Sequence, residues 1–398
     1  MSKKIKVLVV PSDRTGVGSF RSIDPHTALE KYYPDEFRVE INYDPWKNRD
    51  TYWQDFDILH FHRGMGDWGN CLRLLKDCKK WGIKTIMDID DFWMPGPEHP
   101  AHTMIVEEKI NLRIIENVKA AEYVTTTTKE FVKEIIPYNK NVETFPNAID
   151  PSKRQFTPKP EDSDVVRIGW LGGSSHLHDL DILRGNIQKL KADPTLKNKY
   201  QMVLCGFDTR GSMTTIGPDG TKHTRKIEPK ESVWYIYEQI MSGDYDIINN
   251  KKDIDELLQF KKGIPKSTDD NYRRVWTKPI TTYATNYNLM DVSLAPLKET
   301  TFNRVKSQLK VIEAGFHKKA LIAQDFGPYA IDCVHGKNSL LVPTSKNHKQ
   351  WYKHIKTLIN NPNMIKDLGE QLYEDVQKYH IKEVTKTRAE WYRSIVNK

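Results

Sequence analysis

The residues best placed to do chemistry lie in the segment NRVKSQLKVIEAG, residues 303–315. Its apolar side chains recur at helical spacing and predict one helix with a buried stripe at Val305, Leu309 and Ile312. A second stripe on that helix carries an amide, two ammonium groups and a carboxylate: Asn303, Lys306, Lys310 and Glu313. Such a set suits a nucleoside diphosphate, because ammonium groups neutralise phosphate and a carboxylate accepts hydrogen bonds from ribose hydroxyls. A solvated surface face is the alternative, and the spacing leaves both open.

Two glycine turns follow strand-like runs. Gly16 and Gly18 lie in PSDRTGVGSFR, and Gly172 and Gly173 lie in WLGGSSHLHDL. Glycine lets backbone amides approach a phosphate, so both turns are predicted to contact the substrate, with ordinary turns as the alternative. Neither a complete dinucleotide-binding fingerprint nor a Walker sequence occurs, which argues against classical dinucleotide binding and P-loop nucleotide hydrolysis.

Polar side chains also gather where two strand-like runs end. TIMDIDDFW contains Asp88, Asp90 and Asp91, and ILHFHRG contains His60 and His62. Clustered carboxylates hold Mg²⁺ or Mn²⁺, orient an acceptor hydroxyl or cap a helix. We place Asp90 and Asp91 among the substrate-binding residues and expect no resident metal. One of the two histidines is expected to point toward a cleft, the alternative being a core histidine.

The elements that must position these residues form two α/β series in a chain of 398 residues, a length that suits two domains. Strands alternate with helices, which predicts doubly wound, mostly parallel sheets whose strand ends face one ligand cleft. The predicted parts are an N-terminal domain, a linker, a C-terminal domain with an insertion, and a C-terminal helix: residues 1–150, 151–164, 165–375 with 209–278 inserted, and 376–398.

Composition narrows the class of protein. Apolar residues make up 38% and charged residues 29%, no apolar run approaches membrane-spanning length, and the N-terminal apolar run reads as a first strand instead of a signal peptide. Four cysteines without a C-x-x-C pair predict reduced thiols in a cytoplasmic protein, not a disulfide frame or zinc site. The net charge of +8 favours a polyanionic partner: nucleic acid, an anionic lipid surface or a nucleotide-linked substrate.

Several segments together resemble the glycosyltransferases of family 4 (glycosyl transferases group 1), which have the GT-B fold. KSQLKVIEAGFHKKALIAQD is similar to their donor-site helix and following strand, and FPNAID, IGWLGG and GVG are similar to strings elsewhere in that family. The resemblance implies a retaining transfer from a nucleotide sugar, usually without metal. It identifies Glu313 with the ribose-binding glutamate, Lys310 with a lysine of distant members, and His62 as a candidate for the cleft histidine. The family's first glutamate falls at Val305, so the contact to the donor sugar stays open.

The resemblance also implies roles in catalysis. Lys306, Lys310 and the amides near Gly172 and Gly173 are expected to stabilise the departing diphosphate, while His62 contacts donor sugar or acceptor. The acceptor is left open between a glycan, a lipid-linked molecule and a modified base of DNA, as used by viral enzymes. The basic aromatic segment NYRRVWTK (271–278) allows the last of these. A nucleotide-sugar epimerase and a non-catalytic nucleotide-sugar-binding protein are the alternatives from other classes.

Overall fold

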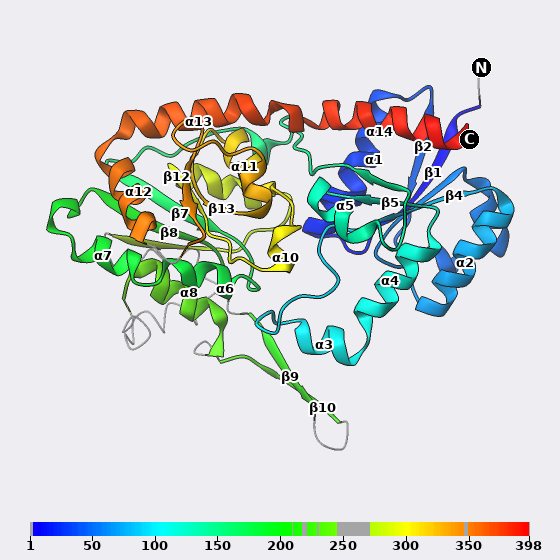
Figure 1. Cartoon of the computed structure of the whole chain (residues 1–398), viewed down its shortest axis with the longest axis horizontal. Coiled ribbons are helices and arrows are strands. Elements are labelled where there is room, and N and C mark those ends of the chain that lie inside the picture. The colour runs from blue at the N-terminus through cyan, green and yellow to red at the C-terminus, as the bar shows by residue number, and fades with distance from the viewer. Residues whose placement is uncertain are drawn as a thin grey trace. The chain divides into compact units, whose positions relative to one another are not determined.

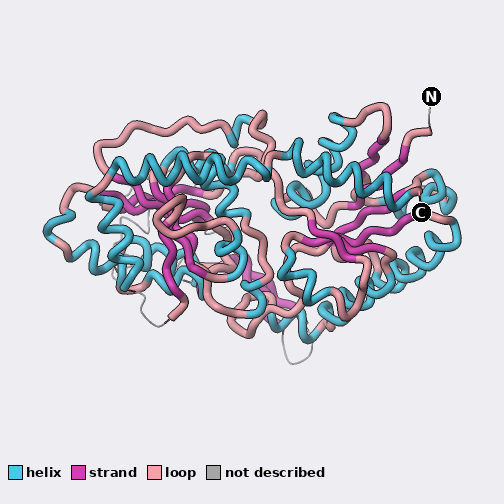
Figure 2. Tube along the Cα trace, turned by 45° about the horizontal axis from the view of Figure 1, so that its top comes forward, coloured by secondary structure: helices cyan, strands magenta, loops and turns pink. Residues whose placement is uncertain are grey.

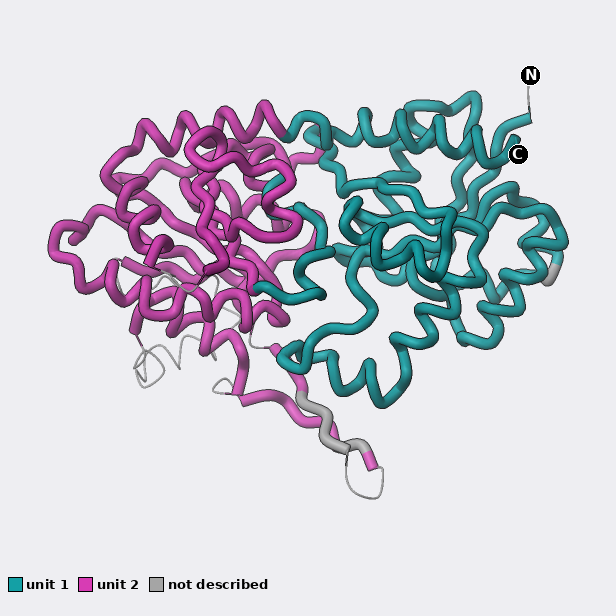
Figure 3. Tube along the Cα trace, in the orientation of Figure 1, with its two compact units in different colours: residues 1–151, 299–312, 376–398 teal, residues 152–298, 313–375 magenta. Residues whose placement is uncertain are grey.

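The chain forms two structural units (Figure 3). The computed structural model describes residues 3–208, 210–216, 221–228, 231–244, 271–345 and 349–397. Unit 1 comprises residues 1–151, 299–312 and 376–398, and unit 2 comprises residues 152–298 and 313–375. The division differs from the predicted one in two segments, both of which belong to unit 1. The prediction placed residues 299–312 within the C-terminal domain and residues 376–398 in a separate helix.

Unit 1 is built on a six-stranded sheet in the order β2-β1-β3-β4-β5-β6, and all of its neighbouring strands run parallel. The sheet confirms the predicted βαβ alternation and adds β2, a strand that the sequence reading did not identify. Figure 2 shows its strands between helices. The strands are β1 (Ile5–Val10), β2 (Phe37–Ile41), β3 (Ile58–His62), β4 (Lys84–Asp88), β5 (Tyr123–Thr126) and β6 (Val142–Thr144).

Alternating side chains of unit 1's central strands bury both faces of the sheet. In β1, Val7 and Val9 pack with residues of α14, whereas Leu8 and Val10 pack in the cluster that includes α2, α4 and α5. Helix α14 lies beside α1 (Figure 1). The helices are the π-helical η1 (Gly18–Ile23), α1 (Asp24–Tyr32), α2 (Trp68–Trp81), α3 (His102–Glu107), α4 (Ile110–Ala120), α5 (Lys129–Ile135), α10 (Thr301–Arg304) and α14 (Ile381–Val396).

Unit 2 contains a second six-stranded parallel sheet, in the order β11-β8-β7-β12-β13-β14. Large side chains such as Trp170, Tyr237 and Trp351 fill its core. The strands are β7 (Val166–Leu171), β8 (Tyr200–Phe207), β11 (Tyr272–Trp276), β12 (Val292–Ala295), β13 (Ala320–Asp325) and β14 (Leu340–Pro343). The helices are α6 (Leu177–Leu180), α7 (Asn186–Ala192), α8 (Val233–Ser242), the 3-10 helix η10 (Tyr283–Leu289), α12 (Lys349–Asn360) and α13 (Pro362–Val376). Helix α11 (Leu309–Phe316) crosses the boundary between the units.

The predicted insertion, 209–278, is only partly an addition to unit 2. Its beginning forms a hairpin of the antiparallel strands β9 (Ser212–Ile216) and β10 (Lys222–Lys226). However, α8 and β11 also fall inside the predicted insertion, and β11 is an edge strand of the main sheet, so the predicted end near residue 278 is wrong. The part of the predicted insertion at 245–270 lies outside the described residues.

The segment that allowed a contact with DNA coincides with β11. Tyr272 and Arg274 are buried, and Arg274 forms a buried ion pair with Glu238 of α8. Arg273 pairs with Glu161 at 3.3 Å. These side chains therefore bond other residues of unit 2, and the basic and aromatic composition of the segment no longer favours a nucleic-acid surface.

No helix in the described part of the chain has the length and apolar character needed to cross a membrane.

Candidate functional site

The predicted polar residues of unit 1 meet where β3 and β4 end. Because the strands are parallel and paired in register, His62 lies opposite Asp88. Asp90 and Asp91 follow in the loop after β4, and Arg63 and Gly64 follow β3. The carboxyl ends of parallel strands are the usual ligand side of such a sheet, so this edge is the candidate site of unit 1.

Asp88 is committed to a buried ion pair with Arg21 of η1. Arg21 Nη2 donates to Asp88 Oδ1 at 2.7 Å and Nε donates to Oδ2 at 2.9 Å, in the two-pronged geometry that guanidinium and carboxylate groups favour. The Thr125 hydroxyl donates to Asp88 Oδ1 at 2.6 Å. Arg21 also donates to the Phe145 carbonyl at 2.7 Å. Asp88 therefore ties η1 to β4 and β5 and leaves the predicted acidic cluster.

Asp90 joins His62 and Arg63 in a second polar cluster. His62 Nε2 donates to Asp90 Oδ1 at 2.9 Å, and Arg63 Nη2 donates to the same oxygen at 2.8 Å. Arg63 Nη2 also approaches Asp91 Oδ2 at 3.4 Å. Burial alone would raise the pKa of the Asp90 carboxyl, but Arg63 and His62 outweigh it and hold that pKa well below its usual range. Asp90 is thus an anion that positions the histidine ring.

Arg63 occupies an unusual backbone conformation. Its φ is +57°, in the left-handed region that a side chain with a Cβ rarely adopts. The Arg63 amide donates to the Asp88 carbonyl at 3.0 Å, and Asn117 Nδ2 of α4 donates to the Arg63 carbonyl at 2.9 Å. Strand β4 and helix α4 thus hold this conformation in place, as is common at ligand sites.

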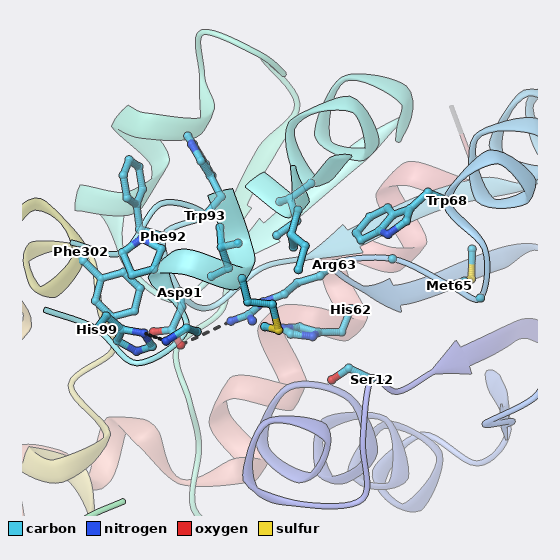
Figure 4. A pocket seen from close by; sticks show the side chains of 18 residues that line it. Ser12, His62, Arg63, Met65, Trp68, Asp91, Phe92, Trp93, His99 and Phe302 are labelled. Atoms are coloured by element: carbon cyan, nitrogen blue, oxygen red, sulfur yellow. Dashed lines mark hydrogen bonds and ion pairs between the residues drawn. The ribbon is translucent and has the colours of Figure 1, made fainter. Parts of the chain in front are cut away.

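A pocket of about 420 Å³ opens at this edge of unit 1. In Figure 4, the Arg63 guanidinium points toward Asp91, and the aromatic rings of Trp68, Phe92 and Trp93 lie around them. The residues that line it, which we call the unit 1 pocket, are Ser12, His62, Arg63, Gly64, Met65, Gly66, Trp68, Asp91, Phe92, Trp93, Pro95, His99, Ala101, Met104, Ile105, Ile110, Ile114 and Phe302. Of the predicted site residues, the structure brings His62, Asp90 and Asp91 together here.

The acidic cluster does not have the arrangement of a metal site. Asp88 bonds Arg21, and Asp90 and Asp91 bond Arg63, so each carboxylate already faces a cation. Within the described ranges, no group of three or more His, Cys, Asp or Glu side chains could hold a metal ion.

The first glycine turn, after β1, is closed by an internal carboxylate. Asp13 Oδ1 accepts hydrogen bonds from the Thr15 amide at 2.7 Å and the Gly18 amide at 3.2 Å. A Cβ at Gly18 would lie 1.9 Å from the Asp13 carbonyl oxygen, so glycine is needed for this close approach. The Gly18 amide is thereby occupied by the protein itself, while Gly16 lies two residues earlier, in the helical backbone just before η1.

The second glycine turn follows β7 in unit 2. A Cβ at Gly172 would come within 2.4 Å of the Trp170 ring, whereas a Cβ at Gly173 would meet nothing within 4 Å. The Tyr237 hydroxyl donates to the Ser174 carbonyl at 3.0 Å and accepts from the His176 amide at 2.9 Å. Gly172 is thus required by packing, whereas the space beside the Gly173 Cα is open.

A buried carboxylate, Asp179, links two loops at this end of unit 2. Its side chain accepts hydrogen bonds from His176 Nδ1 at 2.8 Å and from the Lys298 amide, beyond β12, at 2.9 Å. Burial would raise the pKa of Asp179, but the hydrogen bond and charge of His176 lower it overall. Asp179 therefore remains an anion that fixes the loop after β7 against the loop after β12.

Glu313 is buried, although the predicted stripe placed it on an outer face. Its side chain accepts a short hydrogen bond from Tyr283 and one from Tyr287 at 3.0 Å, both from η10. Burial and the nearby Glu313 charge raise the pKa of Tyr287 well above its ordinary value. Burial likewise raises the pKa of Tyr329, and both Asp179 and Glu313 add to the effect, so the two carboxylates act on one hydroxyl.

The prediction of one continuous helix over residues 303–315 is wrong. Helix α10 ends at Arg304, and α11 begins at Leu309. The residues between them are held by other segments of unit 1: Asn147 Nδ2 donates to Ser307 Oγ at 3.0 Å, and Gln308 Nε2 donates to Tyr379 at 2.9 Å.

This break separates the predicted second stripe. Lys310 and Glu313 remain together on α11, while Asn303 and Lys306 do not share that helix. Asn303 is buried, its amide donates to Thr300 Oγ1 at 3.1 Å, and the Lys306 ammonium lies 4.8 Å from the Phe302 ring centre. Lys306 and Lys310 therefore do not repeat along one helix face. Of the two lysines, Lys310 alone shares α11 with Glu313.

Sequence reasoning missed the partners that hold the predicted residues. Arg63 directly follows His62 at the end of β3, and a cation at the end of the strand beside the one that carries the aspartates was a usable signal. Tyr287 had no such signal, because its partner Glu313 is distant in sequence, and nothing local indicated the contact of Asp179 with Lys298.

Comparisons with known proteins identify the fold. No protein-family model and no curated protein matches this chain. Among solved structures, sucrose-phosphate synthase from Thermosynechococcus elongatus matches over 100% of both chains, with 12% identity and a TM-score of 0.62. HepE from Anabaena in complex with UDP-glucose covers 98% of this chain and 99% of its own, with 12% identity and a TM-score of 0.58. A glycosyltransferase from Rickettsia africae covers 99% of each chain, with 13% identity and a TM-score of 0.60. The fold is GT-B, with two Rossmann-like α/β domains, which confirms the predicted fold class.

Proposed function

We propose that this protein transfers a sugar from a nucleoside diphosphate sugar to a hydroxyl of an acceptor. The observation that carries the proposal is the match over almost the whole chain to HepE in complex with UDP-glucose, together with the Rickettsia africae glycosyltransferase. A likeness that spans both units supports a function that needs both of them. The polar strand ends of each unit supply the groups that such a reaction requires.

In the proposed reaction unit 2 binds the donor. Glu313 accepts hydrogen bonds from the ribose hydroxyls, a role supported by a carboxylate that two tyrosines hold in a fixed orientation. The diphosphate lies against the turn at Gly172 and Gly173, where Gly173 has open space beside its backbone. Lys310, three residues before Glu313 on α11, neutralises the charge that develops on the leaving diphosphate.

In the same proposal unit 1 binds the acceptor and the transferred sugar. His62, oriented by Asp90, contacts these groups, and the Asp91 carboxylate accepts a hydrogen bond from a hydroxyl. Gly16 of the first turn approaches the substrate; Gly18, whose amide already bonds Asp13, shapes the turn. Asn303 and Lys306 lie next to Phe302, which lines the unit 1 pocket, and so support its edge.

We further propose that transfer retains the anomeric configuration and needs no divalent metal. The resemblance of residues 306–325 to the donor-site segment of family 4 supports retention. Metal independence is supported by Asp88, Asp90 and Asp91, each of which already bonds an arginine.

A thermal-shift screen with nucleotides and nucleotide sugars, each with and without Mg²⁺, tests the donor. A nucleotide sugar at 100 times its dissociation constant should stabilise the protein by about 2.7 kcal/mol. A selective shift, followed by donor turnover that depends on added acceptor, is the expected result. Conversion of the donor to another sugar without an acceptor would indicate an epimerase. Donor binding without turnover of any kind would indicate a binding protein, and no shift with any nucleotide would overturn the proposal.

A further inference from the structure

The walls of the unit 1 pocket are mostly apolar. Trp68, Phe92 and Met104 are among the aromatic and aliphatic side chains that line it, and they come from the start of α2, the loop after β4 and α3. A volume of about 420 Å³ lies in the range of sites that bind small molecules. An apolar group that leaves water to contact these walls binds with a favourable free energy. A sugar that is polar on every side gains little binding free energy from the same walls.

The polar end of the pocket has no spare positive charge. Among the described residues that line it, Arg63 is the one lysine or arginine. Its guanidinium already bonds Asp90 and Asp91, so one cation faces two carboxylates. A phosphate group placed beside Arg63 would face the Asp91 carboxylate, and the guanidinium it would need is already shared between Asp90 and Asp91. The pocket therefore discriminates against anionic ligands and suits a neutral one.

The same end still offers acceptors of hydrogen bonds. His62 is 2% exposed and lines the pocket, and while its Nε2 donates to Asp90, its Nδ1 has no hydrogen-bond partner among the described residues. A buried polar atom without a partner is costly, and a ligand hydroxyl that donates to it would remove that cost. The Asp91 side chain is 37% exposed and can accept a second hydrogen bond.

From these observations we propose that the acceptor is an uncharged, hydroxyl-bearing molecule with an alkyl or aromatic group. Its apolar group binds in the unit 1 pocket, and one of its hydroxyls hydrogen-bonds to His62 and Asp91. The inference rests on the proposed function and names its acceptor class. It separates that class from acceptors that would bring a phosphate into the pocket. The alkyl and aromatic sources share this chemistry, and the experiment distinguishes between them.

The test measures binding of matched probes to the full chain by titration calorimetry. Octyl β-D-glucoside, below its micelle-forming concentration, and 4-nitrophenyl β-D-glucoside carry the same sugar as methyl β-D-glucoside and differ in the apolar group. At least one of the first two should bind ten or more times more tightly than the methyl compound, and the tighter of them identifies the alkyl or aromatic source. Octyl phosphate should bind at least tenfold more weakly than octyl glucoside.

A pair of variants on α3 locates the binding. Met104 lines the pocket and is 50% exposed, whereas Val106 is 45% exposed on the same helix and does not line it. Met104→Glu should reduce the preference for the apolar probe at least tenfold, while Val106→Glu should leave it within twofold. Since both side chains are half exposed, both variants should fold, and circular dichroism checks this.

The two proposals fail in different ways. If nucleotide sugars bind but the apolar and methyl probes bind equally, or octyl phosphate binds as well as octyl glucoside, the acceptor class is wrong and the transferase proposal stands. If both variants lose binding equally, the site is not the unit 1 pocket. If no nucleotide binds while the apolar probe binds in the pocket, the pocket's ligand class is supported and the transferase proposal fails.

Discussion

At the scale of single residues, the candidate site depends on partners that fix predicted side chains in place. His62 is oriented by Asp90, and Glu313 by two tyrosines. The types of these residues were readable from sequence, as were the placement of His62 and Asp90 at strand ends and of Glu313 on a helix. Their burial was not, because it depends on residues of other elements, such as η10 packing over α11.

Glu313→Gln tests the carboxylate that is proposed to bind ribose. The substitution keeps the size of the side chain but removes its charge, and we expect nucleoside diphosphate affinity to fall at least tenfold, or about 1.4 kcal/mol, because hydrogen bonds to a charged group are the stronger ones. Titration calorimetry with the nucleotide identified by the thermal-shift screen measures this change.

Tyr287→Phe is the matched control for Glu313→Gln. It removes one hydrogen bond to the carboxylate and leaves the charge, so it should lower the free energy of unfolding by about 1 kcal/mol and change affinity less than threefold. Normal nucleotide affinity in Glu313→Gln would remove the ribose role, and equal loss of affinity in both variants would make that role structural.

At the scale of elements, long and strongly patterned segments were predictable and segments held by distant contacts were not. Strand β1, IKVLVV, is rich in apolar residues, and strand β3, ILHFH, is buried along its whole length on both faces of the sheet. Strand β2, FRVEI, is a short edge strand that includes two charged residues, and its pattern gave no comparable signal. The apolar spacing of residues 303–315 predicted one helix, but contacts of Ser307 and Gln308 with distant residues of unit 1 override that local preference.

The turn after β7 offers a test within two adjacent residues. A methyl group at Gly172 would overlap the buried Trp170 ring, so Gly172→Ala should lower the free energy of unfolding by about 1–3 kcal/mol, the usual cost of overpacking a core. A methyl group at residue 173 meets open space, so Gly173→Ala should change the free energy of unfolding by less than about 0.5 kcal/mol.

Urea unfolding followed by tryptophan fluorescence measures both glycine variants. If the two prove equally stable, the packing of Trp170 does not explain the glycine at residue 172. If Gly173→Ala is stable but binds nucleotide normally, close approach of the ligand to the Gly173 backbone is also excluded.

At the scale of the whole molecule, unit 1 encloses a polar core between its sheet and its C-terminal helix. His26 donates to the Ser22 carbonyl at 2.6 Å and meets the Tyr392 hydroxyl of α14 at 2.7 Å, and the His26 and His60 rings lie 4.3 Å apart. Burial lowers the pKa of both histidines well below the ordinary value, and the positive charge of Arg388 adds to this. Both rings are therefore neutral in the folded unit.

This core predicts a loss of stability in mild acid. The folded-state pKa of each histidine lies below its unfolded value near 6.5, so this loss of stability is absent above about pH 6.5. As the pH falls below it, the unfolded chain binds protons that the folded unit does not, and the free energy of unfolding drops by up to about 1.4 kcal/mol per pH unit for each histidine. The depressed pKa values of Asp13, Glu36 and Asp90 act only near and below their ordinary values of about 4 to 4.5, so the range from about 6.5 to 5 isolates the histidines.

Hydrogen exchange of the β1 and β3 amides between pH 7.5 and 5, corrected for intrinsic exchange, reports the opening of unit 1 alone. His60→Leu replaces a buried ring that has no hydrogen-bond partner among the described residues, and it should reduce the pH dependence by up to half. An unchanged pH dependence in this variant, or none in the native protein, would contradict the assignment.

The three-part make-up of unit 1 has a consequence during synthesis on the ribosome. The face of its sheet that carries Val7, Val9 and Ile58 is covered by Ala389, Tyr392 and Ile395 of α14. A ribosome adding 5–20 residues per second needs roughly ten to forty-five seconds to make the intervening residues 152–375. During that interval the N-terminal sheet emerges with this face bare. Unit 2, whose residues are complete at 375, is therefore able to finish folding first, so the half of the protein made earliest is the half completed last.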